Sequence, residues 1–401
     1  QLTQTLPAIF RLLNKRKYVL YTYPQIHNNN NNFISIMKIE CVKDKLRDAV
    51  MLAEKLTGKN MALPILNAVL LIAEDSSVKI RATNLDLGIE ITVPVKVLKE
   101  GIAAIPGSVF SQLLSNSFEK TVVCELTDGN MRITTNNSST TIKSSSYEDF
   151  PTLPAVRSKN PFVIASKKFI SGLKSVLYSA SVSDAKPELA SVYLSYDQGY
   201  LVCAATDSFR LAERKIAVTV KEAFPPTLIP GKNVAEIIRI FDRMEGDMEI
   251  HFDNHQLSVS LDGIYVTSRV IDGVFPDYKQ ILPKGHTTEV VILKQDLVNA
   301  IKVSNVFSDK LNHVDFDIQP KKKLFEIRSR NFDIGENSTR VDAALSGENV
   351  SISFNYRYIL DCLPVIQKDS IALQFNGEAR PMVIQGVGDR LFTYLVMPLN
   401  R

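Results

Sequence analysis

A repeat with a period of about 124 residues constrains this 401-residue chain more than any other sequence feature. The stretch Ile105–Val109 returns as Ile229–Val234, and Phe150-Pro151 returns as Phe275-Pro276. A third motif recurs in Ala82–Leu87, Ala205–Leu211 and Arg330–Ile334. Similarity at a fixed period indicates tandem copies of one structural unit, so the chain is predicted to contain three copies.

Each copy opens with a strand followed by an amphipathic helix. The three openings are Lys38–Leu56, Phe162–Ala180 and Glu289–Val306. Each copy then divides into two similar halves, each a strand, one helix and further strands. This pattern predicts an α+β fold of three tandem domains, in which helices cover one face of antiparallel sheets.

Helical periodicity and turn signals support this division. Apolar residues with helical spacing are Leu46, Ala49, Val50, Ala53 and Leu56; Phe169, Leu173, Val176, Leu177 and Ala180; and Val234, Ile237, Ile238 and Phe241. Alternating strands surround four hairpin signals: Asp128-Gly129, Gln198-Gly199, Asp262-Gly263 and Asn376-Gly377.

Proline-rich segments mark the linkers between the copies. Phe-Pro followed by Leu-Pro occurs over 150–154 and again over 275–283. Proline lacks an amide donor and interrupts strand pairing, so the boundaries are predicted near 156 and 285. The domains are then 37–156, 157–285 and 286–401.

The first 36 residues differ from the rest. They contain Arg11, Lys15, Arg16 and Lys17 and no acid, so they hold the whole net charge of +4. Five consecutive asparagines, 28–32, cannot bury apolar area, and we expect this segment to be a disordered extension. One interpretation is a targeting peptide. The favoured one is an extension upstream of Met37, because no cleavage-type site follows and a strand begins there.

Composition excludes several classes of protein. A hydrophobic content of 45% excludes a disordered chain, and the apolar runs are too short for a membrane span. The cysteines Cys41, Cys124, Cys203 and Cys362 form no CxxC pair. A zinc ribbon, a redox motif and a disulfide scaffold are therefore not expected, and a reducing cytosol fits.

The order and the sequences of these motifs resemble those of the β sliding clamp family of bacterial DNA polymerase III, and the resemblance covers the whole of 37–401. The most specific motifs are Leu63–Leu66, Thr83–Leu87, Ala205–Ala212, Asp272–Tyr278 and Tyr394–Leu399. No single motif decides the matter, but all of them occur in register with the threefold repeat.

The resemblance implies a head-to-tail homodimer whose six similar domains close a ring around duplex DNA, with helices inside and antiparallel sheets outside. It implies a non-enzymatic processivity factor that tethers the DNA polymerase III catalytic subunit and other proteins bearing a clamp-binding motif. A separate clamp loader would use ATP, and no cofactor is expected. The implied location is cytoplasmic and nucleoid-associated, away from membranes.

In this family two helices per domain line the hole, which here would be 44–56, 108–118, 167–180, 231–243, 294–306 and 355–368. These ranges hold 13 basic and 7 acidic residues, whereas the body from Met37 onward is neutral. A positive lining suits a polyanion held topologically, since tight phosphate contacts would impede sliding. The predicted DNA-facing residues are Lys59, Lys167, Lys174, Lys232, Arg239, Lys302, Lys310 and Arg357.

The resemblance also implies a peptide-binding pocket between the second and third domains. Its predicted residues are Leu189, Thr206, Ser208, Phe209, Arg210, Leu211, Pro230, Val234, Asn355, Tyr358, Pro381, Val396, Met397, Pro398 and Leu399. Apolar residues would take leucine and phenylalanine anchors, and Arg, Asn and Tyr would contact the peptide backbone. For Leu189, Leu211 and Val234 a purely structural place in the core is the alternative.

Three departures from the family pattern alter the expectations. The chain ends Leu399-Asn400-Arg401, where relatives often end with a basic residue and then Leu, so the pocket rim is expected to differ. Ser208 stands where Gly is common, which is expected to narrow the slot. The polar edge segment 141–143 predicts a weaker ring contact than apolar residues would give.

An enzyme is not expected, because the sequence contains no GxxxxGK[ST], GxGxxG or GxSxG motif. His251 and His255 flank a predicted hairpin turn and lack a third zinc ligand. Asp315 and Asp317 lie on an alternating strand, which indicates a solvated face. The remaining alternative is a peptide-binding repeat scaffold that does not bind DNA. The excess of basic residues on the predicted helices is evidence against this alternative.

Overall fold

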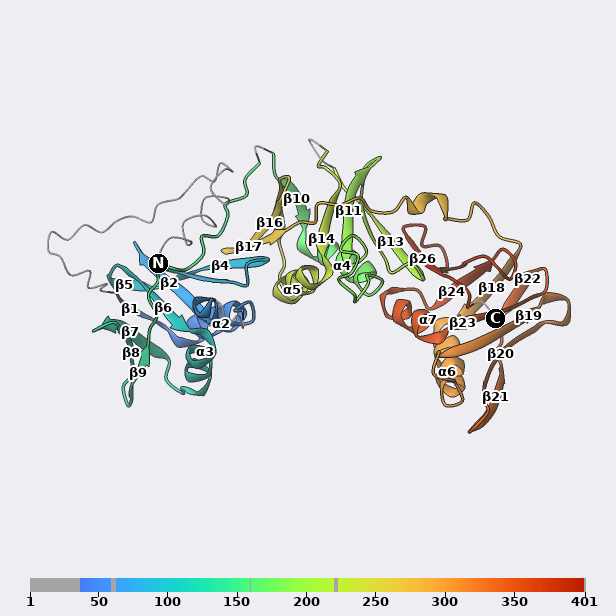
Figure 1. Cartoon of the computed structure of the whole chain (residues 1–401), viewed down its shortest axis with the longest axis horizontal. Helices are drawn as coiled ribbons and strands as arrows, with labels where there is room; N and C mark the ends of the chain where they lie inside the picture. The colour runs from blue at the N-terminus through green and yellow to red at the C-terminus, as the bar shows by residue number, and fades with distance from the viewer. Residues whose placement is uncertain (1–36, 59–62, 159, 220–222, 400–401) are drawn as a thin grey trace, which may run out of the picture.

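The structure is a computed structural model that describes residues 37–58, 63–158, 160–219 and 223–399. The predicted N-terminal extension, 1–36, lies outside these residues, as does Lys59. The three domains follow one another along an arch, with helices on its concave side and sheets on its convex side (Figure 1). No helix in the described part is long and apolar enough to cross a membrane.

Two α-helices from each domain lie on the concave side. They are α2 (Lys43–Glu54), α3 (Gly107–Asn116), α4 (Ser166–Leu177), α5 (Gly231–Phe241), α6 (Lys294–Asn305) and α7 (Tyr356–Cys362). One face of each is buried, as with Phe169, Leu173 and Val176 of α4, which join the main core between helices and sheets. The predicted α+β fold is confirmed.

The last predicted helix, 355–368, is too long. Helix α7 ends at Cys362 and continues only as the 3₁₀ turn η4 (Leu363–Val365). Pro364 has no amide hydrogen to donate to the preceding turn, and its ring would meet the carbonyl four residues earlier, so the α-helix stops there.

Each half-domain has the predicted order of one strand, a helix and three strands. In the first domain these strands are β1 (Lys38–Val42), β2 (Ala68–Glu74), β3 (Ser77–Thr83) and β4 (Leu87–Pro94), then β6 (Gly101–Pro106), β7 (Thr121–Thr127), β8 (Asn130–Thr134) and β9 (Ser139–Lys143). In the second they are β10 (Phe162–Ala165), β11 (Ser191–Asp197), β12 (Tyr200–Thr206) and β13 (Arg210–Ala217), then β14 (Thr227–Pro230), β15 (Asp247–Phe252), β16 (Gln256–Leu261) and β17 (Ile264–Arg269).

The third domain repeats this order. Its strands are β18 (Thr288–Leu293), β19 (His313–Gln319), β20 (Leu324–Asn331) and β21 (Gly335–Arg340), then β23 (Val350–Asn355), β24 (Ser370–Phe375), β25 (Met382–Gly386) and β26 (Phe392–Val396). Two additional strands, β5 (Lys96–Lys99) and β22 (Ala344–Gly347), pair with β1 and β18. Short 3₁₀ turns are η1 (Pro64–Asn67), η2 (Tyr278–Gln280) and η3 (Pro320–Lys322).

Continuous sheets join neighbouring domains. Strand β17 of the second domain pairs antiparallel with β4 of the first, and β26 of the third pairs with β13 of the second. The outcome is an eight-stranded and a nine-stranded sheet that cross the two junctions. Strands β9 and β21 hold the corresponding positions in the repeat, and each ends its sheet as an edge strand among the described residues.

The turn predictions hold in three of four cases. Residues at 128–129, 198–199 and 262–263 all have positive φ and connect adjacent antiparallel strands directly, as two-residue hairpins require. The prediction of a tight hairpin at Asn376-Gly377 is wrong. There β24 and β25 are connected by the longer loop 376–381, and only Gly377 has positive φ.

After its last strand each domain sends a segment across its outer face. We call 145–158 strap 1 and 271–283 strap 2; the third segment is the C-terminal stretch 397–399. Each makes the same bond to an edge strand: the amides of Ser145, Ile271 and Leu399 donate to the carbonyls of Ala104, Leu228 and Ser353 at 2.9, 2.8 and 2.9 Å.

The straps explain the polar face of the third domain. Strap 1 covers an apolar cluster with Phe150, and strap 2 covers another with Phe275 and Tyr278. The third domain has no such cover among its described residues, and Asp315 and Asp317 lie on the corresponding face of β19. This face is polar but only partly solvated, because Asp317, whose side chain is 17% exposed, pairs with Arg328, and Asp315 accepts a hydrogen bond from Ser353.

Side chains of the second domain fasten strap 1, among them the hydroxyl of Ser258, which donates to the carbonyl of Val156 at 3.2 Å. The hydroxyl of Tyr265 donates to the carbonyl of Pro154 at 2.8 Å and accepts from the amide of Val156 at 2.9 Å. The amide of Ser158 donates to Nδ1 of His251 at 3.0 Å, and its hydroxyl lies 3.1 Å from the same nitrogen. Only a neutral imidazole has a nitrogen that accepts the bond from the amide.

We expect strap 1 to loosen in acid. Burial, and then the charge of Arg157, lower the pKa of His251 below 6.5, while Glu249 opposes them. Because the pKa of His251 is lower in the folded protein than in the unfolded chain, the neutral ring stabilises the fold at pH values above 6.5. This stabilisation is lost as the pH falls from 6.5 towards the lower pKa of the folded protein. Between about pH 7.5 and about pH 5.5 the hydrogen-exchange protection of Ser158 should fall roughly threefold or more. In a His251→Asn variant, which keeps an acceptor that does not titrate, protection should stay nearly constant; an equal loss in both proteins would contradict the assignment.

Candidate functional site

A tight turn between β12 and β13 presents the first group of predicted residues. Oδ1 of Asp207 accepts from the amides of Phe209 and Arg210 at 2.9 and 3.0 Å. The hydroxyl of Thr206 donates to the carbonyl of Arg210 at 2.7 Å and accepts from the amide of Ser208 at 3.2 Å. These bonds hold Ser208 at a φ of 79° and leave Phe209 59% exposed.

The C-terminal strand brings a second exposed apolar residue beside Phe209. Strand β26 pairs with β13, with Val396 opposite Arg210, and the amide of Met397 donates to the carbonyl of Phe209 at 2.8 Å. Val396 is fully buried, whereas Met397 is 38% exposed. Two adaptable apolar side chains therefore meet solvent where the second and third domains join.

Arg210 links the two domains on the concave side of the sheet. Its guanidinium donates to Asp207 at 2.9 Å and to Asp361 of α7 at 2.5 Å, and it lies 4.6 Å from the centre of the Tyr358 ring. Its side chain is only 10% exposed. Nearby, Asn355 accepts from the amide of Arg357 at 3.0 Å and caps α7.

Replacing Arg210 with methionine should weaken this junction. The substitution leaves Asp207, whose side chain is 15% exposed, without its cation, so we expect a loss of about 2 kcal/mol in the free energy of unfolding. The loss is smaller than for a fully buried pair because Asp361 is 45% exposed. The matched control is Arg269→Met, whose ion pair at 4.0 Å should contribute less than about 0.5 kcal/mol. Equal urea midpoints for the two variants would contradict this role.

Leu211 faces the opposite, outer side of the sheet. It pairs with Leu395, and both pack under strap 2 with Phe275 and Tyr278. Burial, and then the charge and hydrogen bond of Glu213, raise the pKa of Tyr278, whose hydroxyl donates to Glu213 at 2.5 Å. The phenol thus keeps its proton and fastens the strap.

Other predicted pocket residues lie around this turn or away from it. Pro381 precedes Met382, which pairs with Val396, and Pro398 and Leu399 follow Met397 toward Ser353. Pro230 pairs with Ser191 of β11, and the amide of the next residue, Gly231, donates to the carbonyl of Ala190, which follows Leu189.

Val234 is fully buried on the core-facing side of α5, so its structural alternative fits the geometry better. The sequence reasoning missed Leu395, Val383 and Tyr278, which share the cluster of Leu211. Two-residue alternation along β13 and β26 would have placed Leu211 and Leu395 on one face.

The first junction provides an internal comparison. Its turn is built alike: Oδ1 of Asn84 accepts from the amides of Asp86 and Leu87, and Leu85 has a φ of 79°. Here Leu85 is 43% exposed, but the positions equivalent to Phe209 and Met397 are the charged residues Asp86 and Arg269. The amide of Arg269 donates to the carbonyl of Asp86, just as Met397 bonds to Phe209. The same scaffold thus carries the ion pair of Asp86 and Arg269 at one junction and the apolar pair of Phe209 and Met397 at the other.

All four predicted DNA-facing cations of the second domain are already paired with acids. Lys167 lies 2.6 Å from Glu245, Arg239 lies 2.7 Å from Glu236, and Lys174 pairs with Asp242. Lys232 lies 2.8 Å from Asp86 of the first domain, across the junction, so it also ties the two domains together.

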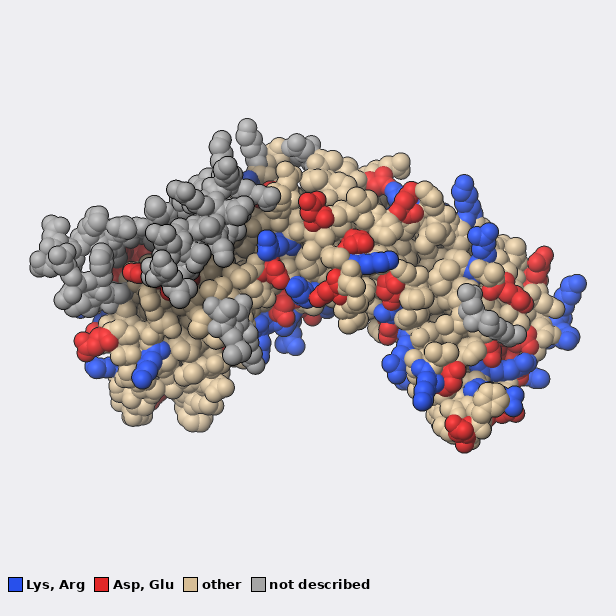
Figure 2. Space-filling view, viewed as in Figure 1, with Lys and Arg blue, Asp and Glu red and all other residues tan. Residues whose placement is uncertain are grey.

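The other cations differ in their surroundings. Lys302, Lys310 and Arg357 of the third domain have no acidic partner within 4.0 Å among the described residues. The six helices as observed carry 11 basic and 6 acidic side chains. Lys and Arg border the concave edge on both sides of the arch, with acids among them (Figure 2). The lining is therefore mildly positive, without a dense cationic patch.

The described residues contain no group of three or more His, Cys, Asp or Glu placed to hold a metal ion. His255 lies in the turn after β15, where Oδ1 of Asp253 accepts a hydrogen bond from its amide. His251 accepts a hydrogen bond from the amide of Ser158 in strap 1. All four cysteines are buried and unpaired, and burial raises the pKa of Cys41 to about 12.

Comparisons with known proteins cover almost the whole chain. Family models of the DNA polymerase III beta subunit match 37–154 (N-terminal domain), 163–277 (central domain) and 279–400 (C-terminal domain). The beta sliding clamp of Bacillus subtilis is 27% identical over 380 residues, which cover 91% of this chain and 100% of the relative. That of Synechococcus elongatus is 26% identical over 373 residues, which cover 91% and 99%. The crystal structure of the DNA polymerase sliding clamp from Bacillus subtilis superposes with a TM-score of 0.88 at 25% identity, covering 92% of this chain and 100% of that one.

Proposed function

The chain belongs to the DNA polymerase III beta subunit family and is a DNA sliding clamp, and we propose that two copies close a ring around duplex DNA and hold the replicative polymerase. Each copy contributes three domains, 37–156, 157–285 and 286–401. The observation that carries the proposal is the pair of sheet edges left at the two ends of the arch, β9 and β21.

The repeat specifies how these edges meet. Both internal junctions pair the last strand of one domain with the fourth strand of its neighbour, and β9 and β21 are the strands of those two kinds that remain. If β9 pairs with β21 of the second copy in the same register as β26 pairs with β13, Ile142 lies opposite Gly335 and Thr140 lies opposite Asn337. A head-to-tail contact of this kind closes after two copies, because each arch has one edge of each kind.

Exposed apolar residues lie where this third junction would form. Val109 of α3 corresponds to Asn233 and Tyr358, which contact the turn of the neighbouring domain at the other two junctions. The facing turn of the second copy would present Phe332 and Ile334. These three side chains are 49%, 89% and 64% exposed. Their burial would compensate for the polar side chains of β9 and β21.

The concave side would face DNA. A mildly positive lining, with several cations held by neighbouring acids, gives a weak and salt-screened attraction to phosphates. Retention would then come from topology, and no base would be read. We propose Lys302, Lys310 and Arg357 as the main contacts, since they have no acidic partner among the described residues.

Client peptides would bind at the second junction, where the second and third domains meet. Phe209 and Met397 provide the exposed apolar surface, and Arg210 and Tyr358 lie beside it. Clients would be the polymerase, a clamp loader and other proteins with a short apolar motif. We propose that the chain performs no catalysis and that a separate loader uses ATP to open the ring.

Native mass tests the ring directly. Multi-angle light scattering should give twice the chain mass of 44.8 kDa at micromolar concentration. A mass of 44.8 kDa under those conditions would contradict a stable two-copy ring.

A further inference from the structure

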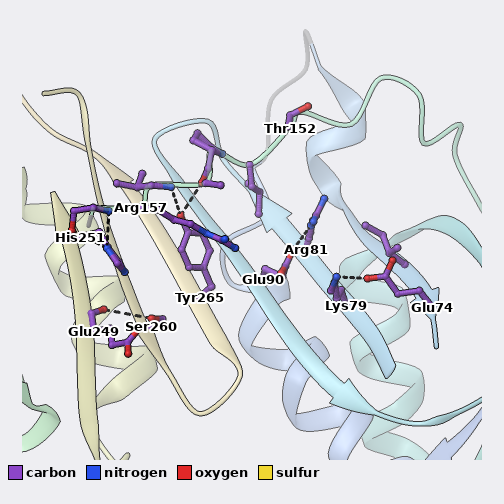
Figure 3. Close-up of a pocket in the computed structure, with 16 residues that line it drawn as sticks. Glu74, Lys79, Arg81, Glu90, Thr152, Arg157, Glu249, His251, Ser260 and Tyr265 are labelled. Carbon is purple, nitrogen blue, oxygen red and sulfur yellow. Dashed lines mark hydrogen bonds and ion pairs between the residues drawn. The ribbon is translucent and has the colours of Figure 1, made fainter. Parts of the chain in front are cut away.

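A hollow of about 680 Å³ lies between strap 1 and the outer face of the eight-stranded sheet (Figure 3). One wall belongs to the first domain, with Glu74, Lys79, Arg81 and Glu90; the other belongs to the second, where Tyr265 lies nearest the junction. The lining holds three acids and three Lys or Arg residues, so its overall charge does not select a ligand.

The same place at the second junction is filled by the chain itself. There Tyr278 of strap 2 donates its hydroxyl to Glu213 at 2.5 Å, and Lys279 donates to Asp197 at 2.6 Å. A tyrosine and the lysine that follows it thus fasten the strap onto two carboxylates of the sheet.

The hollow keeps both carboxylates but not their partners. By the repeat, Glu90 corresponds to Glu213 and Glu74 to Asp197. Counted from Phe150 and Phe275, strap 1 has Leu153 and Pro154 in place of Tyr278 and Lys279, and the Leu-Pro of strap 2 comes later, at 282–283. Neither Leu153 nor Pro154 has a side chain that donates a hydrogen bond.

Instead, the two acids pair with Arg81 and Lys79 of the adjacent strand. The bond from Arg81 uses Oε2 of Glu90, and Oε1 has no hydrogen-bond partner among the described residues. At the second junction Glu213 uses both oxygens, one toward Tyr278 and the other 3.4 Å from Lys215. A second donor therefore fits on Glu90 without displacing Arg81.

We infer that this hollow is a second peptide site, which binds a segment of a partner protein containing a tyrosine followed by a lysine. The ring enters between Ile72 and Leu153 and donates its hydroxyl to Glu90, while the ammonium group reaches Glu74. The partner thereby makes from outside the contacts that strap 2 makes within the chain.

The probe is the blocked synthetic peptide with the sequence of 275–282, which contains Tyr278 and Lys279. Added to the full-length protein, a fluorescent form should show saturable binding by anisotropy. Leu153→Tyr should abolish binding, because the new side chain fills the hollow as Tyr278 fills its counterpart. Glu74→Gln with Glu90→Gln should weaken binding at least about tenfold.

Two controls separate this site from others. Glu148→Gln with Asp149→Asn removes two exposed acids of strap 1 that do not line the hollow, and affinity should stay within about twofold. A peptide with Phe and Met in place of Tyr and Lys should bind at least about tenfold more weakly. Binding that survives Leu153→Tyr in a folded protein, equal affinity for both peptides, or no binding at millimolar peptide would overturn the inference.

Discussion

Replacing both Val109 and Ile334 with glutamate should convert the two-copy ring into monomers. Each ring would have two such junctions, so four carboxylates would be forced into contacts between copies. Burial of unpaired charges at an interface is strongly unfavourable, and we expect the dissociation constant to rise at least about 100-fold. Both residues are about half exposed or more in one copy, so the stability of the protomer should change by less than about 0.5 kcal/mol.

Light scattering over a concentration series gives the outcome. The matched control replaces Val182 and Val274, which are 99% and 87% exposed on the second domain, with glutamate. It adds the same charge to the chain away from β9 and β21 and should leave the dimer intact. If the junction variant remained dimeric, or the control dissociated equally, the proposed contact between α3 and the β20–β21 turn would be wrong.

The second large effect concerns client binding. Replacing Phe209 and Met397 with alanine removes the two exposed apolar side chains at the second junction, while the turn that holds them stays intact. Apolar anchors of this kind carry most of the affinity for short peptides, so the affinity for a leucine- and phenylalanine-containing polymerase peptide should fall at least about tenfold. Calorimetry on the full-length protein measures it.

The repeat offers a matched control for this variant. Asp86→Ala with Arg269→Ala changes the equivalent positions at the first junction and should leave the affinity for the peptide within about twofold. Unchanged affinity in the Phe209→Ala and Met397→Ala protein, or an equal loss in both proteins, would place the client site elsewhere.

The architecture was largely predictable because the sequence contains three copies of the same structural unit. A motif that recurs at a fixed period gives three independent indications of each strand, helix and turn, so an ambiguous segment such as 330–334 is interpreted through its counterparts. The prediction was wrong where one copy departs from the others. Pro364 shortens the last helix. The loop at 376–381 replaces the two-residue turn that the first copy has between the corresponding strands, β7 and β8.

The candidate site was less predictable, for a physical reason. A list of residues carried over from a resemblance does not say which face of the sheet each occupies. Arg210 and Leu211 are neighbours in sequence, yet one reaches Asp361 on the concave side and the other packs under strap 2. Alternation along the strand predicts that separation, but the partners across the sheet are known only once the strands are paired.

Charge showed a similar limit. The count of basic residues on the helices correctly gave a positive balance but not its pairing. Lys232 was predicted to face DNA, and the structure joins it to Asp86 across the first junction. That partner is 146 residues away in sequence, and no local pattern connects the two.

The central claim is that the protein is held on DNA by its closed shape, and linearising the DNA tests it most directly. The protein is loaded by a clamp loader onto nicked circular duplex, free protein is removed, and the DNA is then cut once with a restriction enzyme. The account predicts that the protein stays on the circle through a high-salt wash and leaves within minutes of the cut, by sliding off the ends. Equal retention on the circular and the cut DNA would contradict a topological clamp.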